Sequence, residues 1–175
     1  ESGFDHASIR QNGTVVPLVK EKVIIYDTRA EEIPAGPPHP LLVFGLVALA
    51  CVVISVLDYK KKKLSLWLDV VLFGSTGLVG CILFFLWFFT DHNDAAYNLN
   101  LLWALPTNLI ALLALKRKPL WLEKYFLVIA ILQGLLLVTW WVLPQQLNTA
   151  LIPVAASLLV RSLLHYRLRK SVVLQ

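Results

Sequence analysis

The sequence has 175 residues, of which 58% are hydrophobic and 15% charged, with a mean hydropathy of +0.69. Soluble globular domains contain about a quarter charged residues and at most about half apolar ones, so this composition excludes an ordinary soluble domain and predicts a membrane protein. The two cysteines and eight glycines exclude a disulfide framework and a collagen-like repeat, and the net charge of +5 does not indicate nucleic-acid binding because the basic residues lie at the ends of apolar stretches.

Residues 1–37 are mixed in polarity and contain two short apolar runs rich in β-branched side chains. These runs, Val15–Val19 and Val23–Tyr26, predict two strands. Because so short a pair is not stable alone, we expect this segment to be the end of an external, periplasmic domain whose earlier part precedes Glu1. The absence of methionine from the whole sequence supports that expectation. The proline-rich stretch Ile33–Pro40 predicts a stiff link into the membrane.

Five apolar stretches between residues 38 and 170 are long enough to cross a bilayer, which takes about 17 to 25 helical residues. They run approximately from Leu41 to Leu57, Leu64 to Phe89, Leu99 to Leu115, Tyr125 to Leu143 and Leu147 to Leu164. The third and fifth are short, and each contains a proline. The sequence therefore predicts an all-α polytopic membrane protein with five transmembrane helices over residues 38–170, preceded by the short strand segment and followed by a cytoplasmic tail at residues 171–175.

The distribution of basic residues predicts the orientation of the spans, since Lys and Arg concentrate on the cytoplasmic side of a membrane. Basic clusters follow the first, third and fifth spans. The loops after the second and fourth spans, Thr90–Asn98 and Pro144–Gln146, contain neither Lys nor Arg. We therefore expect the N-terminus to lie outside and the C-terminus in the cytoplasm.

Several polar residues lie inside the predicted spans. Asp69 and Arg161 lie near the inner ends of their spans, where they can pair with each other or reach the interface, and we expect them to act as structural anchors. Asn108 and Gln133 are expected to hold helices together, because polar residues in membrane bundles commonly form hydrogen bonds across helices. The second span also carries a face of small residues for close helix contact, formed by Gly74, Gly77 and Gly80.

The segment between the second and third spans, Thr90 to Pro106, is the richest in groups suited to catalysis. His92 can transfer a proton near neutral pH, and the neighbouring Asp91 carboxylate or an amide can fix its tautomer. Asn98 and Asn100 lie at the start of the third span, where an Asn caps a helix and its amide can hold a carbonyl oxygen. The competing interpretation is a solvated connecting loop with an ordinary helix cap.

At helical spacing, Asn100, Trp103 and Asn108 would form a polar stripe that descends from the outer surface. No catalytic-triad order, phosphate-binding loop, zinc-ligand spacing or dinucleotide fingerprint occurs, so we expect neither a metal nor a cofactor. Cys51 and Cys81 are interpreted as packing residues, because a membrane thiol oxidase would use a C-x-x-C pair, which is absent.

The order Thr90-Asp91-His92, then Tyr97-Asn98-Leu99-Asn100-Leu101-Leu102-Trp103, then Pro106 resembles a loop in the C-terminal membrane domain of Lnb-type proteins of Bacteroidota. The resemblance implies a papain-like periplasmic domain in front of several membrane spans. The segments Pro17-Leu18-Val19-Lys20 and Ile24-Ile25-Tyr26 are similar to the end of that periplasmic domain. The resemblance thus covers the whole chain, as the C-terminal half of such a protein.

That family includes lipoprotein N-acyltransferases, which move an acyl chain from a phospholipid to the α-amine of a diacylglyceryl lipoprotein. The resemblance implies a phospholipid donor, a lipoprotein acceptor and a site at the periplasmic face of the bacterial inner membrane. The nucleophile would be a cysteine of the papain-like domain, and neither Cys51 nor Cys81. His92 would assist proton transfer, and four residues would bind substrate: Asp91, Asn98, Asn100 and Trp103.

The leading alternative is a non-catalytic membrane anchor or subunit that docks a periplasmic partner or a larger membrane complex. A small lipid or solute transporter is less favoured, because the sequence lacks the paired broken helices and midplane charges that such sites use.

Overall fold

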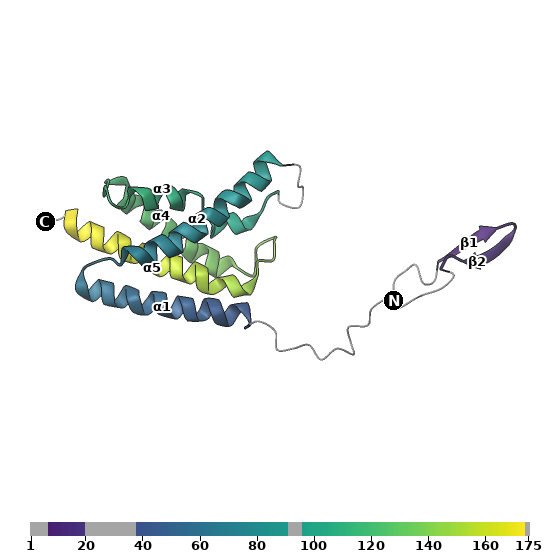
Figure 1. Ribbon diagram of the computed structural model, residues 1–175, viewed down its shortest axis with the longest axis horizontal. Coiled ribbons are helices and arrows are strands. Elements are labelled where there is room, and N and C mark those ends of the chain that lie inside the picture. Colours follow the sequence, from purple (N-terminus) through teal and green to yellow (C-terminus); the bar gives the residue numbers. More distant parts are fainter. Residues whose placement is uncertain (1–6, 20–37, 91–95, 174–175) are drawn as a thin grey trace. The chain divides into compact units, whose positions relative to one another are not determined.

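A computed structural model describes residues 7–19, 38–90 and 96–173 of the chain. The chain divides into two compact units, Glu1–Pro37 and Pro38–Gln175. The described residues of the second unit form the helices α1 Pro40–Lys61, α2 Leu66–Phe89, α3 Thr107–Ala114, α4 Trp121–Thr139 and α5 Ile152–Val173, with two short 3-10 helices, η3 Leu99–Leu102 and η4 Thr149–Leu151 (Figure 1). The prediction of an all-α multi-pass membrane protein is confirmed.

The described part of the first unit is a β-hairpin. Strand β1, Ser8–Gln11, pairs antiparallel with β2, Thr14–Pro17, and Ile9 lies opposite Val16. The turn between the strands is Asn12-Gly13, and both residues have positive φ, 51° and 84°. A two-residue turn of this kind matches the natural twist of paired strands.

The hairpin corrects the strand prediction in part. The predicted strand Val15–Val19 overlaps β2, whereas β1 was missed because its four residues, SIRQ, are mostly polar. The second predicted strand, Val23–Tyr26, lies outside the described residues. The Asn12-Gly13 pair lies at the turn of the hairpin.

Within the described residues, four helical segments are long and apolar enough to cross a membrane: Pro40–Lys61, Leu66–Phe89, Trp121–Thr139 and Thr149–Arg169. Only 11% of the apolar window of α1 and 28% of that of α2 are buried inside the protein. Most other apolar side chains of these two helices are exposed or only partly buried, which is typical of helices in contact with lipid.

The predicted third span, Leu99 to Leu115, is not one continuous helix. It consists of η3, a break and the eight-residue α3. Pro106 has no N–H with which to bond the carbonyl of Leu102, four residues earlier, so the helix cannot pass through this point unbroken. The side chain of Gln133 in α4 donates to that carbonyl instead, at 2.9 Å. Gln133 therefore holds helices together, as predicted, at the point where the span breaks.

Helix α2 lies in backbone contact with the broken span. A Cβ atom placed on Gly80 would lie 2.0 Å from the carbonyl oxygen of Ala104, and one on Gly77 would lie 2.8 Å from Cγ of Leu109. At Gly80 the neighbouring atoms belong to the backbone and leave no space for a Cβ, so glycine is required there, whereas a Cβ at Gly77 would force Leu109 to shift. The predicted small-residue face of α2 is confirmed, and it fixes the position of η3.

Candidate functional site

The first polar cluster lies at η3 and includes residues predicted to bind substrate. Oδ1 of Asn98 accepts hydrogen bonds from the backbone N–H of Asn100 at 3.0 Å and from its Nδ2 at 2.8 Å. Oδ1 of Asn100 in turn accepts from Nε1 of Trp103 at 2.9 Å. The backbone N–H of Leu99 donates to Oε1 of Gln145 at 2.6 Å. We call the side chains of Asn98, Asn100, Trp103 and Gln145 the Asn98 cluster.

The Asn98 cluster fixes amide groups at the start of η3. Asn98 is the N-cap of η3, as its position predicts. Its Oδ1 is occupied, whereas none of the described residues accepts a hydrogen bond from its Nδ2. Asn98 is partly exposed, so these N–H groups are available to a carbonyl oxygen or an oxyanion.

Trp103 connects the Asn98 cluster to the apolar core. It is 8% exposed and packs in an apolar cluster with Ala104, Leu136 and Trp140. Its indole is therefore largely occupied by the protein core, and its N–H orients Asn100. Gln145 was not singled out in the sequence, because it lies in a short loop 46 positions away from Leu99 and no spacing rule links the two.

The two remaining predicted site residues, His92 and Asp91, lie outside the described residues. Their roles stay predictions. They directly follow Thr90, the residue after the end of α2. The described residues between them and Asn98 begin at Ala96.

Asn108 belongs to a separate buried network. Its Nδ2 donates to Oγ1 of Thr76 in α2 at 3.2 Å, and its Oδ1 accepts from the hydroxyl of Tyr125 in α4 at 2.7 Å. The predicted packing role of Asn108 is thus confirmed. The predicted polar stripe from Asn100 to Asn108 is wrong, because the break before α3 removes the helical spacing between them.

A buried ionic cluster joins α1, α2 and α5. Nε of Arg161 lies 2.5 Å from Oδ1 of Asp69, and Nη1 lies 2.7 Å from Oδ2 of Asp58. Nη2 donates to the carbonyl of Ser65 at 3.0 Å. Nε2 of His165 lies 3.0 Å from Oδ1 of Asp69. We call Asp58, Asp69, Arg161 and His165 the Arg161 cluster.

The Arg161 cluster is confirmed as a structural pair but is deeper than predicted. The side chains of Arg161, Asp69 and His165 are fully buried, so Arg161 does not reach the interface. Asp58 also accepts from the N–H and the hydroxyl of Ser65, both at 2.7 Å, and so fixes the turn between α1 and α2. Sequence analysis missed Asp58 and His165; each lies near a basic run at the end of a span and resembles an interfacial residue.

Metal-binding groups and thiols are the other reactive groups considered among the described residues. Within the described ranges, no three His, Cys, Asp or Glu side chains are grouped so that they would hold a metal ion. Cys51 and Cys81 are free thiols, and Cys51 is buried with its Sγ 3.9 Å from the carbonyl of Ser157. This environment is that of a packing residue, as predicted.

Comparison with known proteins identifies the membrane unit. Residues 32–171 match the Lnb transmembrane domain family, which is more than half of the chain. No curated protein and no solved structure matches the chain. The broken span, the Asn98 cluster and the multi-pass helical bundle are therefore features of a chain that belongs to the Lnb transmembrane domain family.

Proposed function

We propose that this chain is the membrane half of a lipoprotein N-acyltransferase, which moves an acyl chain from a phospholipid to the N-terminal amine of a diacylglyceryl lipoprotein. The observation that carries the proposal is the Asn98 amide. Two accepted hydrogen bonds hold its oxygen, and its N–H groups are left for a ligand at the start of η3. Membership of the Lnb transmembrane domain family supports the proposal, and so does the presence of His92 six positions before Asn98 in the sequence.

The proposed reaction has two steps. A cysteine thiolate of the papain-like domain attacks the ester carbonyl of the phospholipid, and the lysophospholipid leaves as its alcohol after taking up a proton. The lipoprotein amine then attacks the resulting thioester, the C–S bond breaks and an amide forms. Both steps pass through an oxyanion, to which the Asn98 N–H groups would donate. His92, oriented by Asp91, would accept the proton that the amine loses.

The end of α2 supports a site for lipid tails. Phe85, Phe88 and Phe89 are exposed by 55%, 57% and 69%, and they precede the segment that carries His92. Figure 1 shows the C-terminal end of α2 extending away from the other helices of the unit. Exposed aromatic side chains at this end of α2 are suited to contact with acyl chains near the boundary between the hydrocarbon and the headgroups.

We also propose that the protein lies in the bacterial inner membrane, with its N-terminus in the periplasm and its C-terminus in the cytoplasm. In a chain that carries Cys51→Ala and Cys81→Ala, an Asn93→Cys residue should react with an impermeant maleimide added outside intact cells. A Lys61→Cys control should react only after the inner face is opened, because basic segments remain cytoplasmic. Modification of Asn93→Cys from the cytoplasmic side alone would overturn this orientation.

The catalytic proposal is tested by comparing two asparagines that form the same local structure. Asn148 caps η4 as Asn98 caps η3, with Oδ1 accepting from the N–H two residues on, at 2.9 Å and 3.0 Å. Replacement by alanine removes one cap in each case, which costs about 0.5–2 kcal/mol of stability. Only Asn98→Ala should also lower the rate of lipoprotein N-acylation, by about 10²–10³-fold, which is the usual cost of removing one oxyanion donor.

The assay measures N-acylation at equal amounts of folded protein in the membrane. Equal rates in the Asn98→Ala and Asn148→Ala variants would show that Asn98 is only a helix cap. That outcome would favour the alternative of a non-catalytic membrane anchor.

A further inference from the structure

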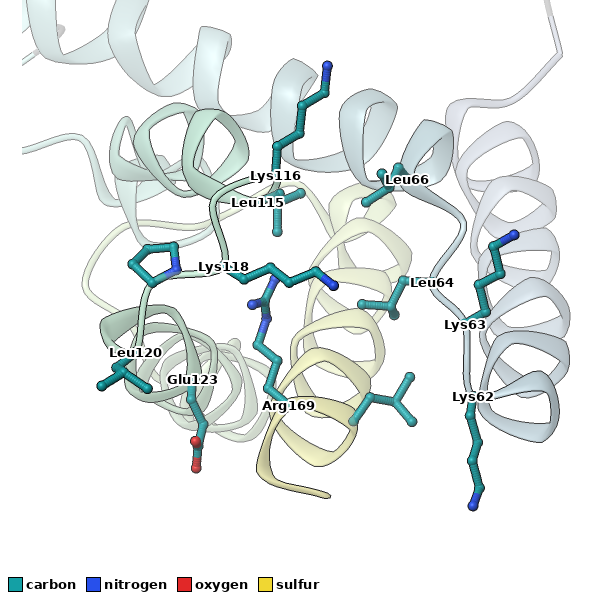
Figure 2. A pocket seen from close by; sticks show the side chains of 12 residues that line it. Lys62, Lys63, Leu64, Leu66, Leu115, Lys116, Lys118, Leu120, Glu123 and Arg169 are labelled. Carbon is teal, nitrogen blue, oxygen red and sulfur yellow. The ribbon is translucent and has the colours of Figure 1, made fainter. Parts of the chain in front are cut away.

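A second site lies at the basic end of the bundle, at the opposite end of α2 from the Asn98 cluster. Here a pocket of about 550 Å³ opens between the ends of α1, α2, α3, α4 and α5 (Figure 2). The volume is within the range of about 300–1,000 Å³ that small-molecule sites occupy. Neither the Asn98 cluster nor the Arg161 cluster contributes a residue to its lining. The acyl-transfer proposal makes no use of it.

The pocket is strongly basic. Its lining contains five cationic side chains, Lys62, Lys63, Lys116, Lys118 and Arg169, and one acidic side chain, Glu123. None of the five forms an ion pair with an acidic side chain in the described part of the chain. A group of unpaired cations at one opening attracts an anion.

Two of these cations converge on the middle of the pocket. Figure 2 shows the side chains of Lys118 and Arg169 extending into the same space, whereas Lys62, Lys63 and Lys116 extend outward from the rim. Like charges brought together repel one another unless an anion lies between them. Lys118 is held in this position by a left-handed backbone conformation, with φ of 48°, and by a hydrogen bond from its N–H to the carbonyl of Ala114 at 3.1 Å.

Arg169 provides an unsatisfied donor beside the pocket. Its Nε is buried and has no hydrogen-bond partner among the described residues. Its guanidinium carbon lies over the Phe126 ring, 5.9 Å from the ring centre. A guanidinium held in this way can make two parallel hydrogen bonds to the oxygens of a phosphate.

The rest of the lining is apolar. Leu64, Leu66, Leu115, Leu120 and Leu168 lie among the cations, and Leu120 is 80% exposed. A free inorganic anion or an acidic soluble protein would leave these leucines without a matching surface. A phospholipid matches both the cations and the leucines, because its phosphate is anionic and its acyl chains begin a few ångströms from that phosphate. Basic pockets between membrane helices at the cytoplasmic side bind anionic headgroups for this reason.

We propose that this pocket binds one anionic phospholipid from the leaflet at the basic end of the bundle. Its phosphate lies between Lys118 and Arg169, and the first carbons of its acyl chains lie on the leucines. The bound lipid joins the turn between α3 and α4, which carries Lys118, to the end of α5, which carries Arg169. The proposal does not depend on acyl transfer, so either one can fail without the other.

The test uses the full 175-residue chain, stripped of lipid in detergent and titrated with phosphatidylglycerol or phosphatidylethanolamine while bound lipid is measured by native mass spectrometry. The anionic lipid should bind at least about tenfold more tightly than the zwitterionic one, given the contribution of each basic residue near a headgroup. Lys118→Gln with Arg169→Gln should weaken phosphatidylglycerol binding by about 25-fold, at about fivefold for each cation.

The matched control is Arg117→Gln with Lys124→Gln, which removes the same charge from exposed residues at the same end that do not line the pocket. This control should change binding by less than about twofold if the contact is local and not a general surface attraction. Equal losses in the two double variants would overturn the proposal. Displacement of the lipid by millimolar inorganic phosphate would also overturn it, since that result describes a small-anion site.

Because Arg169 is partly buried, Lys118→Gln alone is a second variant that leaves α5 intact. Lys118 is exposed, and its replacement should weaken phosphatidylglycerol binding by about fivefold. A change no larger than that in Arg117→Gln alone would contradict the proposed place of the phosphate.

Discussion

Replacing Arg161 with leucine is expected to reduce the amount of folded protein to a small fraction of the native level. The guanidinium contacts both Asp58 and Asp69, so its loss leaves two carboxylates buried in the bundle without a cation. Removing one partner of a buried ion pair costs about 3–5 kcal/mol, because an uncompensated charge stays in a medium of low polarity. That cost is a large part of the total stability of an ordinary domain, which is about 5–15 kcal/mol.

The measurement is the amount of monodisperse protein in detergent and its midpoint of thermal unfolding. Arg117→Leu is the matched control, because Arg117 is exposed and contacts no acidic side chain in the described ranges. A triple variant, Arg161→Leu with Asp58→Asn and Asp69→Asn, should regain much of the loss, since no net charge remains buried. If the single variant were as stable as the Arg117→Leu control, the Arg161 cluster would not be the anchor of α1, α2 and α5.

Gly80→Ala is the second substitution with a large expected effect, although it adds only one methyl group. The new Cβ would lie 2.0 Å from the Ala104 carbonyl oxygen and 2.7 Å from its carbon, and these are backbone atoms that no rotamer change can move. Overpacking of a tight contact costs about 1–3 kcal/mol, and a backbone clash belongs at the upper end of that range. The change should also displace the backbone at Ala104, which follows η3, and with it Asn98 and Asn100 at the start of η3.

We therefore expect Gly80→Ala to lower both thermal stability and N-acylation. Gly134→Ala and Gly45→Ala are matched controls, because a Cβ at either position meets nothing within 4 Å. In a helix these controls should be neutral or slightly stabilising, since alanine loses less backbone entropy than glycine. A Gly80→Ala variant that behaved like the controls would show that α2 and the broken span are not in rigid contact.

Hydropathy and charge predict the parts of the fold that depend on the bilayer itself. The long apolar runs became α1, α2, α4 and the segment Thr149–Arg169, because a backbone in lipid must satisfy its own hydrogen bonds. The basic segments after the first, third and fifth predicted spans line one pocket, so they gather at one end of the bundle, as their alternation along the sequence indicates.

Features that depend on tertiary contacts were not predictable in the same way. Pro106 removes one backbone hydrogen bond from the third span, and the sequence alone shows that much. Whether the helix breaks there depends on a tertiary contact, the hydrogen bond from Gln133 to the freed carbonyl of Leu102. The second partner of Arg161 was missed because Asp58, next to a lysine run, has the sequence context of an interfacial residue. Similarly, Asn100 was recognised as polar, but its orientation by Trp103 is visible only in three dimensions.

The two polar clusters divide the bundle by role. In the Arg161 cluster the guanidinium is satisfied by the protein, since Arg161 contacts two carboxylates and a backbone carbonyl, and the side chains of Arg161, Asp69 and His165 are fully buried. Oδ2 of Asp69 and Nδ1 of His165 are buried without a hydrogen-bond partner among the described residues. The Asn98 cluster retains N–H groups that the described residues do not use. The two clusters differ in access, because a ligand can reach the partly exposed Asn98 but not the buried side chains of Asp69, Arg161 and His165. This difference is the reason for placing the proposed chemistry at η3.

The most direct test of the proposed acyl transfer is the mass spectrum of a lipoprotein N-terminal peptide. The peptide is taken from cells that lack every other N-acyltransferase and express the protein carrying this chain. We expect a third acyl chain in amide linkage with the native protein, and only the diacylated peptide with His92→Ala or Asn100→Ala at equal membrane levels. Diacylated peptide with the native protein, or full triacylation with both variants, would contradict the proposed function.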